Sequence, residues 1–159
     1  MPMRAARCCA ARLAMLARSC GGCEVRIIAL ALWLATAGLG LYLLALRLSH
    51  GGICERPTKI TSFPAALMVS HPVLAAAGLS FWITFVLTRQ VRLAWIAFGI
   101  LCGSALLGFV LLTRWLTARG GRHARQPRQL PGYGIALHGL MAIGTFVFVL
   151  ISATVATHA

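Results

Sequence analysis

Two histidines inside apolar stretches are the residues of this chain whose chemistry most needs an explanation. His71 lies in the run LMVSHPVL, where a proline follows it directly, and His138 lies in the run GYGIALHGLMAIG. An imidazole can coordinate a metal, carry a proton or form a hydrogen bond, and placing one within a membrane costs free energy. Both histidines are therefore candidates for function. The ordinary alternative is a hydrogen bond to a neighbouring helix.

The composition predicts a membrane around these histidines. Of 159 residues, 60% are hydrophobic and 11% are charged, with a mean hydropathy of +0.86. A soluble domain carries about a quarter charged residues. We therefore expect an integral, multi-pass membrane protein in contact with the lipid bilayer, located in a bacterial cell membrane.

Four apolar stretches are long enough to cross a hydrocarbon core, which takes about 20 residues. They predict an all-α, four-helix transmembrane bundle with up-down topology and both termini on the same side. Gly99 with Gly103, and Ser104 with Gly108, are small residues spaced four apart that indicate close helix packing. The spans cover residues of about 27–46, 63–88, 93–116 and 132–156, within a membrane domain of residues 26–159.

The two histidines should lie at similar depth. His71 is about nine residues into its span and His138 about six into its own, which places both roughly 9–14 Å from the same face. The second and fourth helices of an up-down bundle are diagonal, so the imidazoles can point across the centre at one another. Such a pair suits a b-type haem with His71 and His138 as axial ligands.

The surroundings fit this prediction. Four basic residues in the connections at that face could meet the haem propionates, namely Arg56, Lys59, Arg125 and Arg128. The helix faces around the histidines carry apolar or small residues that would admit a porphyrin edge: Leu67, Met68, Leu74, Ala75 and Gly78 in the second span, and Gly134, Ile135, Met141, Ala142 and Thr145 in the fourth.

One ligand on each of two parallel, diagonal helices resembles the haem arrangement of cytochrome b and related small membrane cytochromes. The resemblance covers the second to fourth spans and includes the pair His71-Pro72. It implies haem b and electron transfer. In the two-haem pattern of that family a second histidine follows each ligand after about fourteen positions, where this chain has Phe85 and Ser152. The resemblance therefore implies one haem at most.

Other interpretations stay open. The chain can be a non-enzymatic accessory or packing subunit that binds other membrane subunits, with histidines that only bond between helices. A metal-binding or proton-handling site could recruit His50 or His123, and transport of a small solute or metal ion is a further class. We expect no enzyme acting alone, because Ser70 and His71 diverge on a helix and Ser104 lacks an activating partner.

Residues 1–25 form a basic, cysteine-containing segment ahead of the first span. Three interpretations compete: an amphipathic helix on the membrane surface, a targeting sequence, or an unstructured stretch. Cys20 and Cys23 form a CxxC motif, which can be a redox pair or half of a zinc site. No second CxxC accompanies it, since Cys8 and Cys9 are adjacent, so ordinary thiols are the simpler interpretation.

The charges exclude several functions. Fifteen Lys and Arg residues face two acids, Glu24 and Glu55, and the bases cluster at the span ends, where arginines anchor helices and meet lipid headgroups. We therefore expect no nucleic-acid binding, and we assign no metal site, since carboxylate-based cation coordination lacks its residues. Without a carboxylate in the spans, carboxylate proton relays and paired-carboxylate catalysis lack their residues. The bases divide almost equally between the two faces, so they do not predict the orientation.

Overall fold

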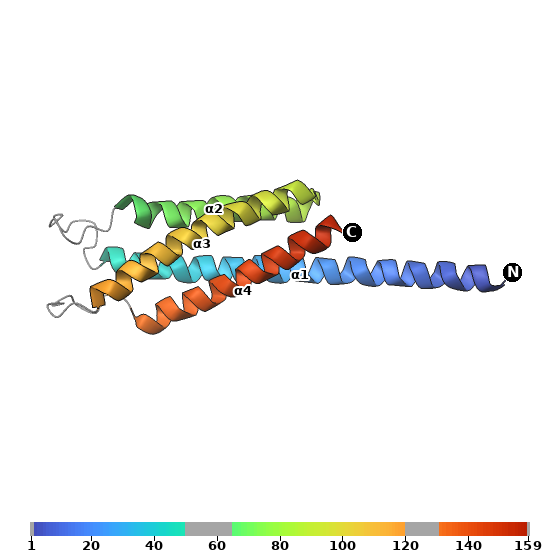
Figure 1. The fold of residues 1–159 in the computed structure, drawn as a ribbon, viewed down its shortest axis with the longest axis horizontal. Coiled ribbons are helices and arrows are strands. Elements are labelled where there is room, and N and C mark those ends of the chain that lie inside the picture. The colour runs from blue at the N-terminus through green and yellow to red at the C-terminus, as the bar shows by residue number, and fades with distance from the viewer. Residues whose placement is uncertain (1, 50–64, 120–130, 159) are drawn as a thin grey trace.

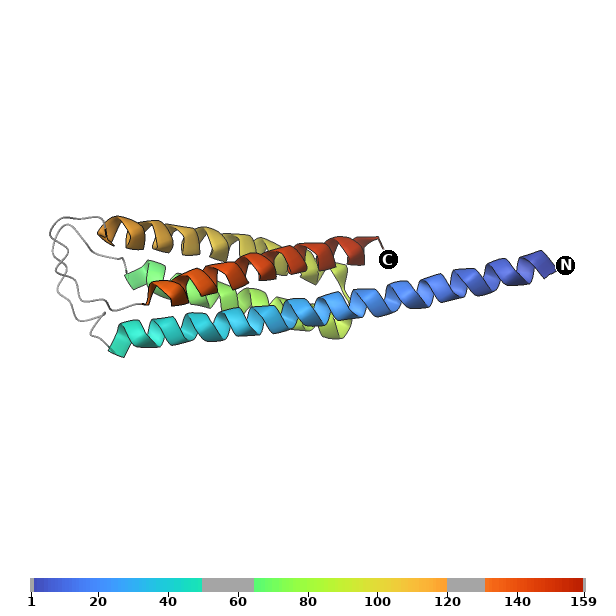
Figure 2. The ribbon, with the colours of Figure 1, turned by 90° about the horizontal axis from the view of Figure 1, so that it is seen from below.

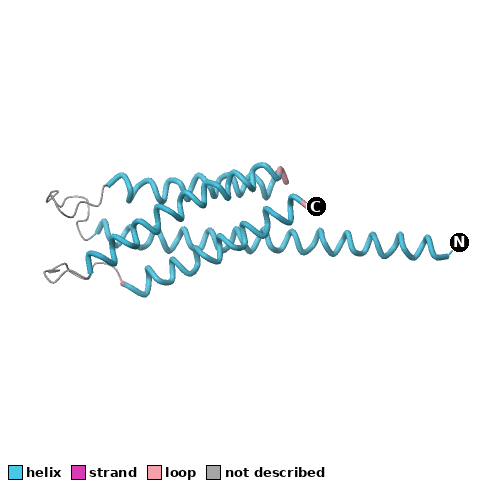
Figure 3. The backbone as a smooth tube through the Cα atoms, viewed as in Figure 1, coloured by secondary structure: helices cyan, strands magenta, loops and turns pink. Residues whose placement is uncertain are grey.

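The computed structural model describes residues 2–49, 65–119 and 131–158, and side chains within 23–49, 66–117 and 131–158. This part of the chain forms four helices and no strand (Figures 1 and 3). They alternate in direction along one bundle, and both termini lie at the same end. The predicted all-α, up-down bundle is confirmed. The helices are α1 (Pro2–Ser49), α2 (Ala65–Thr88), α3 (Val91–Arg119) and α4 (Gly132–Thr157).

Each helix contains a section long and apolar enough to cross a membrane, so the chain is an integral membrane protein. These sections agree with the predicted spans within four residues at every boundary. A helix satisfies its own backbone hydrogen bonds, which is why such segments fold as helices in lipid. The sections are Cys23–Ser49, Ala66–Thr88, Val91–Thr117 and Gly132–Thr157.

Helix α1 is longer than its membrane section. It runs without a break from Pro2 to Ser49, and its first part projects beyond the other three helices (Figure 2). The basic segment 1–25 and the first span are thus joined by continuous helix, while the proposed division at residue 25 stays a prediction.

The bundle has two different ends. At the turn end, α2 and α3 are joined by Arg89 and Gln90, with Arg89 in the left-handed region at φ 62°. Its backbone N–H still donates to the carbonyl of Phe85 at 2.8 Å, which closes α2. At the connection end, α1 and α3 finish while α2 and α4 begin. Pro131 caps α4 there, and its carbonyl accepts the N–H of Gly134 at 3.0 Å.

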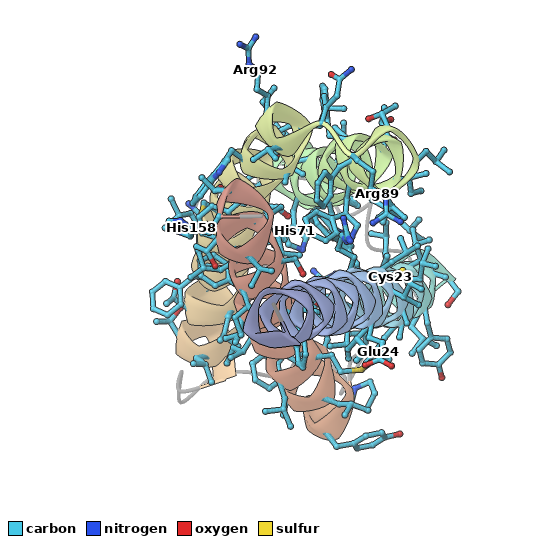
Figure 4. The ribbon with its side chains drawn as sticks, turned by 90° about the vertical axis from the view of Figure 1, so that its right-hand side faces the viewer. Cys23, Glu24, His71, Arg89, Arg92 and His158 are labelled. Carbon is cyan, nitrogen blue, oxygen red and sulfur yellow. The ribbon has the colours of Figure 1, made fainter. Side chains whose placement is uncertain are left out.

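The four helices form two close pairs. Helix α2 packs along α3, and α1 packs along α4, whereas the contacts between the pairs are less extensive. Helices α2 and α4 are diagonal, because none of their described residues bring Cα atoms within 8 Å of each other. Figure 4 looks at the turn end of the bundle, with His71 toward its middle and Arg92 pointing away.

The buried core lies between the histidines and the turn end. Trp33 on α1 lies 6.3 Å from Trp82 on α2 between ring centroids, which joins the two pairs, and Trp82 lies 5.1 Å from Phe85 on its own helix. On the other side, Phe98 and Phe146 approach to 5.0 Å. These contacts join α1 to α2 and α3 to α4 at the turn end.

The small residues of α3 do not all serve packing. Gly99 is exposed, with nothing within 4 Å of the place a Cβ would occupy, whereas Gly103 meets Leu74 and Gly108 meets His71. Of the two glycines Gly99 and Gly103, which were expected to pack closely against another helix, only Gly103 does so. The neighbouring pair Ser104 and Gly108 both contact His71 of α2.

Candidate cofactor-binding site

His71 and His138 face each other inside the bundle. Each lies six residues after the first residue of its helix, Ala65 in α2 and Gly132 in α4. The two helices run in the same direction, so the side chains reach the same depth. Their ring centroids are 6.3 Å apart and the ring planes meet at 78°. The proximity expected from the sequence is present.

Each imidazole is fixed through Nδ1 by the neighbouring helix of its pair. Nδ1 of His71 donates to the carbonyl of Ser104 at 2.9 Å, and Nδ1 of His138 donates to the carbonyl of Thr36 at 3.1 Å. A carbonyl oxygen can only accept, so each Nδ1 carries a proton, and in the neutral imidazole Nε2 then keeps a bare lone pair. This is the arrangement in which a histidine binds a metal through Nε2 while a second partner orients the ring.

Glycines bring the rings close to the partner helices. A Cβ at Gly40 would lie 2.9 Å from Cε1 of His138, and one at Gly108 would lie 3.0 Å from Cε1 of His71. Real Cβ atoms almost never approach another atom so closely, so the rings occupy space that only a glycine leaves free. Each ring therefore contacts two groups one helical turn apart, a carbonyl and a glycine.

The interior beside the histidines is not filled by buried side chains. On the connection side, the described stretches 37–49, 66–77, 105–117 and 132–144 contain one buried residue, Gly134. An apolar groove of about 480 Å³ opens between α3 and α4 in this half, lined in part by Trp115, Ile135 and Gly139. The buried residues that join the two helix pairs thus lie mainly at the turn end, and neither histidine lines the groove.

The positions of a second ligand pair belong to the packed core. Phe85 is fully buried and Ser152 is 3% exposed. Ser152 donates its hydroxyl to the carbonyl of Phe148 at 2.7 Å. Trp82 and Val149 fill the neighbouring space. Buried side chains therefore fill this half of the bundle at both positions.

Several predicted residues lie outside the described part of the chain. Arg56, Lys59, Arg125 and Arg128, expected near the propionates, are among them, as are His50, His123 and Cys54, and so are the side chains of Cys8, Cys9 and Cys20. Cys23 is described and is a free thiol, with Sγ 4.0 Å from an Arg89 guanidinium nitrogen. His158 is exposed beyond α4, at the end away from the other two described histidines.

The metal-ligating side chains among the described residues are few. Among the described residues no group of three or more His, Cys, Asp or Glu side chains is arranged to hold a metal ion. A structural zinc takes four protein ligands and a catalytic zinc three. The two described imidazoles alone make neither kind of site, and His50 and His123, which could add ligands, lie outside the described residues.

From the sequence, none of the other residues that contact the two rings was connected with a histidine. Thr36 and Gly40 are spaced four apart, as are Ser104 and Gly108, and a histidine follows Thr36 after 35 residues and Ser104 after 34. That repeated pattern is the signal that could have linked the small residues to the histidines.

Comparison with known proteins does not assign the chain to a family. No protein-family profile matches the chain, and no curated protein or solved structure is significantly similar to it.

Proposed function

We propose that this protein is a small b-type cytochrome-like membrane protein that binds one haem through His71 and His138. The observation that carries the proposal is the pair of rings, 6.3 Å apart, with each Nδ1 bonded to a carbonyl. Sequence depth alone suggested the pair, and the hydrogen bonds explain why both Nε2 atoms would be free to bind.

The spacing supports a shared metal. Two imidazoles that bind one ion with metal–nitrogen bonds of about 2 Å place their ring centroids roughly 6 Å apart. The observed 6.3 Å agrees with this value. An edge-to-face contact between two rings without a metal also has centroids about 4.5–7 Å apart, so the separation is compatible with a shared metal and does not by itself require one.

The space around the rings supports a large apolar group. Among the described residues of the connection half, Gly134 alone is buried. Well-packed interiors leave few voids larger than a water molecule. A porphyrin inserted edge-on between the pairs would supply the missing contacts there.

Each residue has a definite task in this proposal. A haem with two imidazole ligands accepts and releases single electrons. His71 and His138 hold the iron, while the carbonyls of Ser104 and Thr36 orient the rings and strengthen them as ligands. Arg56, Lys59, Arg125 and Arg128 remain the predicted propionate partners.

The test is optical. Protein purified in mild detergent after expression with ample haem should show a sharp alpha band in the reduced-minus-oxidised spectrum. His71→Ala and His138→Ala should each abolish it, since one imidazole cannot replace two. His158→Ala is the matched control and should keep the band, because that residue lies beyond the end of α4. A colourless wild-type preparation would overturn the proposal.

A second function is favoured by the same hydrogen bonds. Each histidine already links the two helices of its pair, His71 to α3 and His138 to α1, as a purely structural histidine would. On this alternative the protein is an accessory subunit of a membrane complex. It would co-purify with one stable partner and be degraded in cells lacking that partner, and its histidine variants would lose stability without any change in colour.

A further inference from the structure

We infer that the chain contains two equivalent ring holders, each made of a backbone carbonyl and a glycine one turn later. Thr36 and Gly40 hold His138, and Ser104 and Gly108 hold His71. These are positioning residues that fix the Nδ1-protonated form and the ring plane of each histidine. The purpose of this positioning, ligation of haem iron, rests on the proposed function.

The contacts define each holder. In both, Nδ1 bonds to the carbonyl, at 3.1 Å for Thr36 and 2.9 Å for Ser104. In both, the next atom of the ring, Cε1, points at the glycine four residues further along the helix. The ring is thus held along one edge. Rotation of the ring about the Cβ–Cγ bond would break the hydrogen bond or push Cε1 away from the glycine.

The holders belong to an internal repeat of the whole bundle. Buried and ring-contacting residues of α1 recur in α3 at a constant offset of 68 residues. The matching pairs are Ala29 with Ala97, Trp33 with Leu101, Thr36 with Ser104, and Gly40 with Gly108.

Helices α2 and α4 repeat in the same way, at an offset of 67 residues. Here the pairs are His71 with His138, Gly78 with Thr145, Trp82 with Val149, and Phe85 with Ser152, and apart from the two histidines all are buried. The first and second hairpins are therefore copies of one helical arrangement, related by an approximate two-fold axis that passes between the histidines. Two independent holders with the same construction follow from that symmetry.

Other glycines on the same helices show that the holders are specific. Gly38 on α1 and Gly99 on α3 have nothing within 4 Å of a Cβ position. A glycine in a membrane helix is thus not enough to make a holder. Of the described glycines, only Gly40 and Gly108 stand where a methyl group would displace an imidazole.

The experiment compares Gly40→Ala and Gly108→Ala with the matched controls Gly38→Ala and Gly99→Ala. Full-length protein carrying ¹⁵N-labelled histidine is made in a haem-deficient host, and the ring nitrogens are observed by NMR in micelles. In wild type and controls, His71 and His138 should each show one protonated and one bare nitrogen. Each holder variant should shift only the histidine it contacts toward a mixture of the two neutral forms.

A second readout follows haem. Partners that orient a metal-bound histidine are worth about 10- to 100-fold in metal affinity, so we expect at least tenfold weaker haem retention in each holder variant and unchanged retention in the controls. In ferric protein the anisotropy of the low-spin EPR signal depends on the angle between the imidazole planes. It should change in Gly40→Ala and Gly108→Ala alone.

The two proposals fail in different ways. If the protein is colourless but the NMR shifts appear as described, the inference of two ring holders is supported and the haem proposal is wrong. If the holder variants leave the histidine nitrogens unchanged, or if Gly38→Ala and Gly99→Ala shift them equally, the holders are wrong whatever the colour of the protein.

Discussion

Buried polar side chains in this bundle find partners mainly on their own helix. Thr36 donates its hydroxyl to the carbonyl of Leu32 at 2.7 Å, and Thr145 donates to Met141 at 2.9 Å. Their two hydroxyl oxygens also lie 3.1 Å apart. Each hydroxyl has one hydrogen, so one of them must give up its intrahelical bond to make the bridge. The bridge between α1 and α4 therefore adds little net free energy.

Replacing Thr145 by valine tests this argument. Because Thr36 keeps its bond to Leu32, Thr145→Val should lower the free energy of unfolding by about 0.6 kcal/mol or less, the average for a hydrogen bond between membrane helices. The matched control is Thr154→Val, whose hydroxyl bonds only within α4, and which should have no effect. Unfolding in mixed SDS micelles, followed by tryptophan fluorescence, measures both. A loss above about 2 kcal/mol would contradict the argument, since it would match the penalty for leaving a buried polar group unsatisfied.

At the level of elements, the shortest connection carries the most unusual backbone. Arg89 has φ 62°, a conformation in which side-chain-bearing residues are strained, and it is the non-glycine residue with positive φ in the described chain. The Arg89 backbone is strained because the chain must reverse within two residues for α3 to pack alongside α2. Leu93 donates its N–H to the carbonyl of Gln90 at 3.0 Å as the new helix begins.

A glycine at this position should stabilise the protein. Arg89→Gly removes the steric cost of the left-handed conformation, and we expect the free energy of unfolding to rise by about 0.5–1 kcal/mol. Gln90→Gly, one residue on and without positive φ, should instead lower it by a similar amount, because glycine has more freedom to lose. The same SDS titration compares them. The account of the turn is wrong if Arg89→Gly is no more stable than Gln90→Gly.

The elements were predictable because lipid allows few alternatives. Long apolar runs must be helices, and alternating spans place His71 and His138 at one depth on diagonal helices. The partners of their Nδ1 atoms could not be predicted, since hydropathy does not say which neighbour each helix packs against. The pairing of α1 with α4 depends on close contacts such as Leu43 against Gly134, and many other residues of these spans are equally apolar.

At the scale of the whole molecule, the bundle is packed at one end and open at the other. Trp33, Trp82 and Phe85 fill the turn half, and Trp82 is buried with no hydrogen-bond partner for its indole Nε1 among the described residues. The histidines stand where this packing stops. The proposed haem would lie at this boundary, between the two helix pairs.

This shape predicts the haem content. A pyridine haemochrome assay, scaled to protein by amino-acid analysis, should give one haem per chain, because Phe85 and Ser152 occupy the second position with non-ligating, buried side chains. Phe85→Leu should leave that ratio unchanged, as should Ser152→Ala. A ratio near two in wild-type protein would show that the turn half opens to admit a second haem.

The pairing of the helices also sets the order in which the bundle can assemble. The partner of α2 is the next helix, only two residues away, so Ser104 can reach His71 as soon as that hairpin enters the membrane. The partner of α1 is the last helix, and contacts between such distant parts of a chain form slowly. Thr36 must wait for His138 until α4 docks. Any group that lies between the two imidazoles would therefore enter at the final step of assembly, when the last helix closes over it.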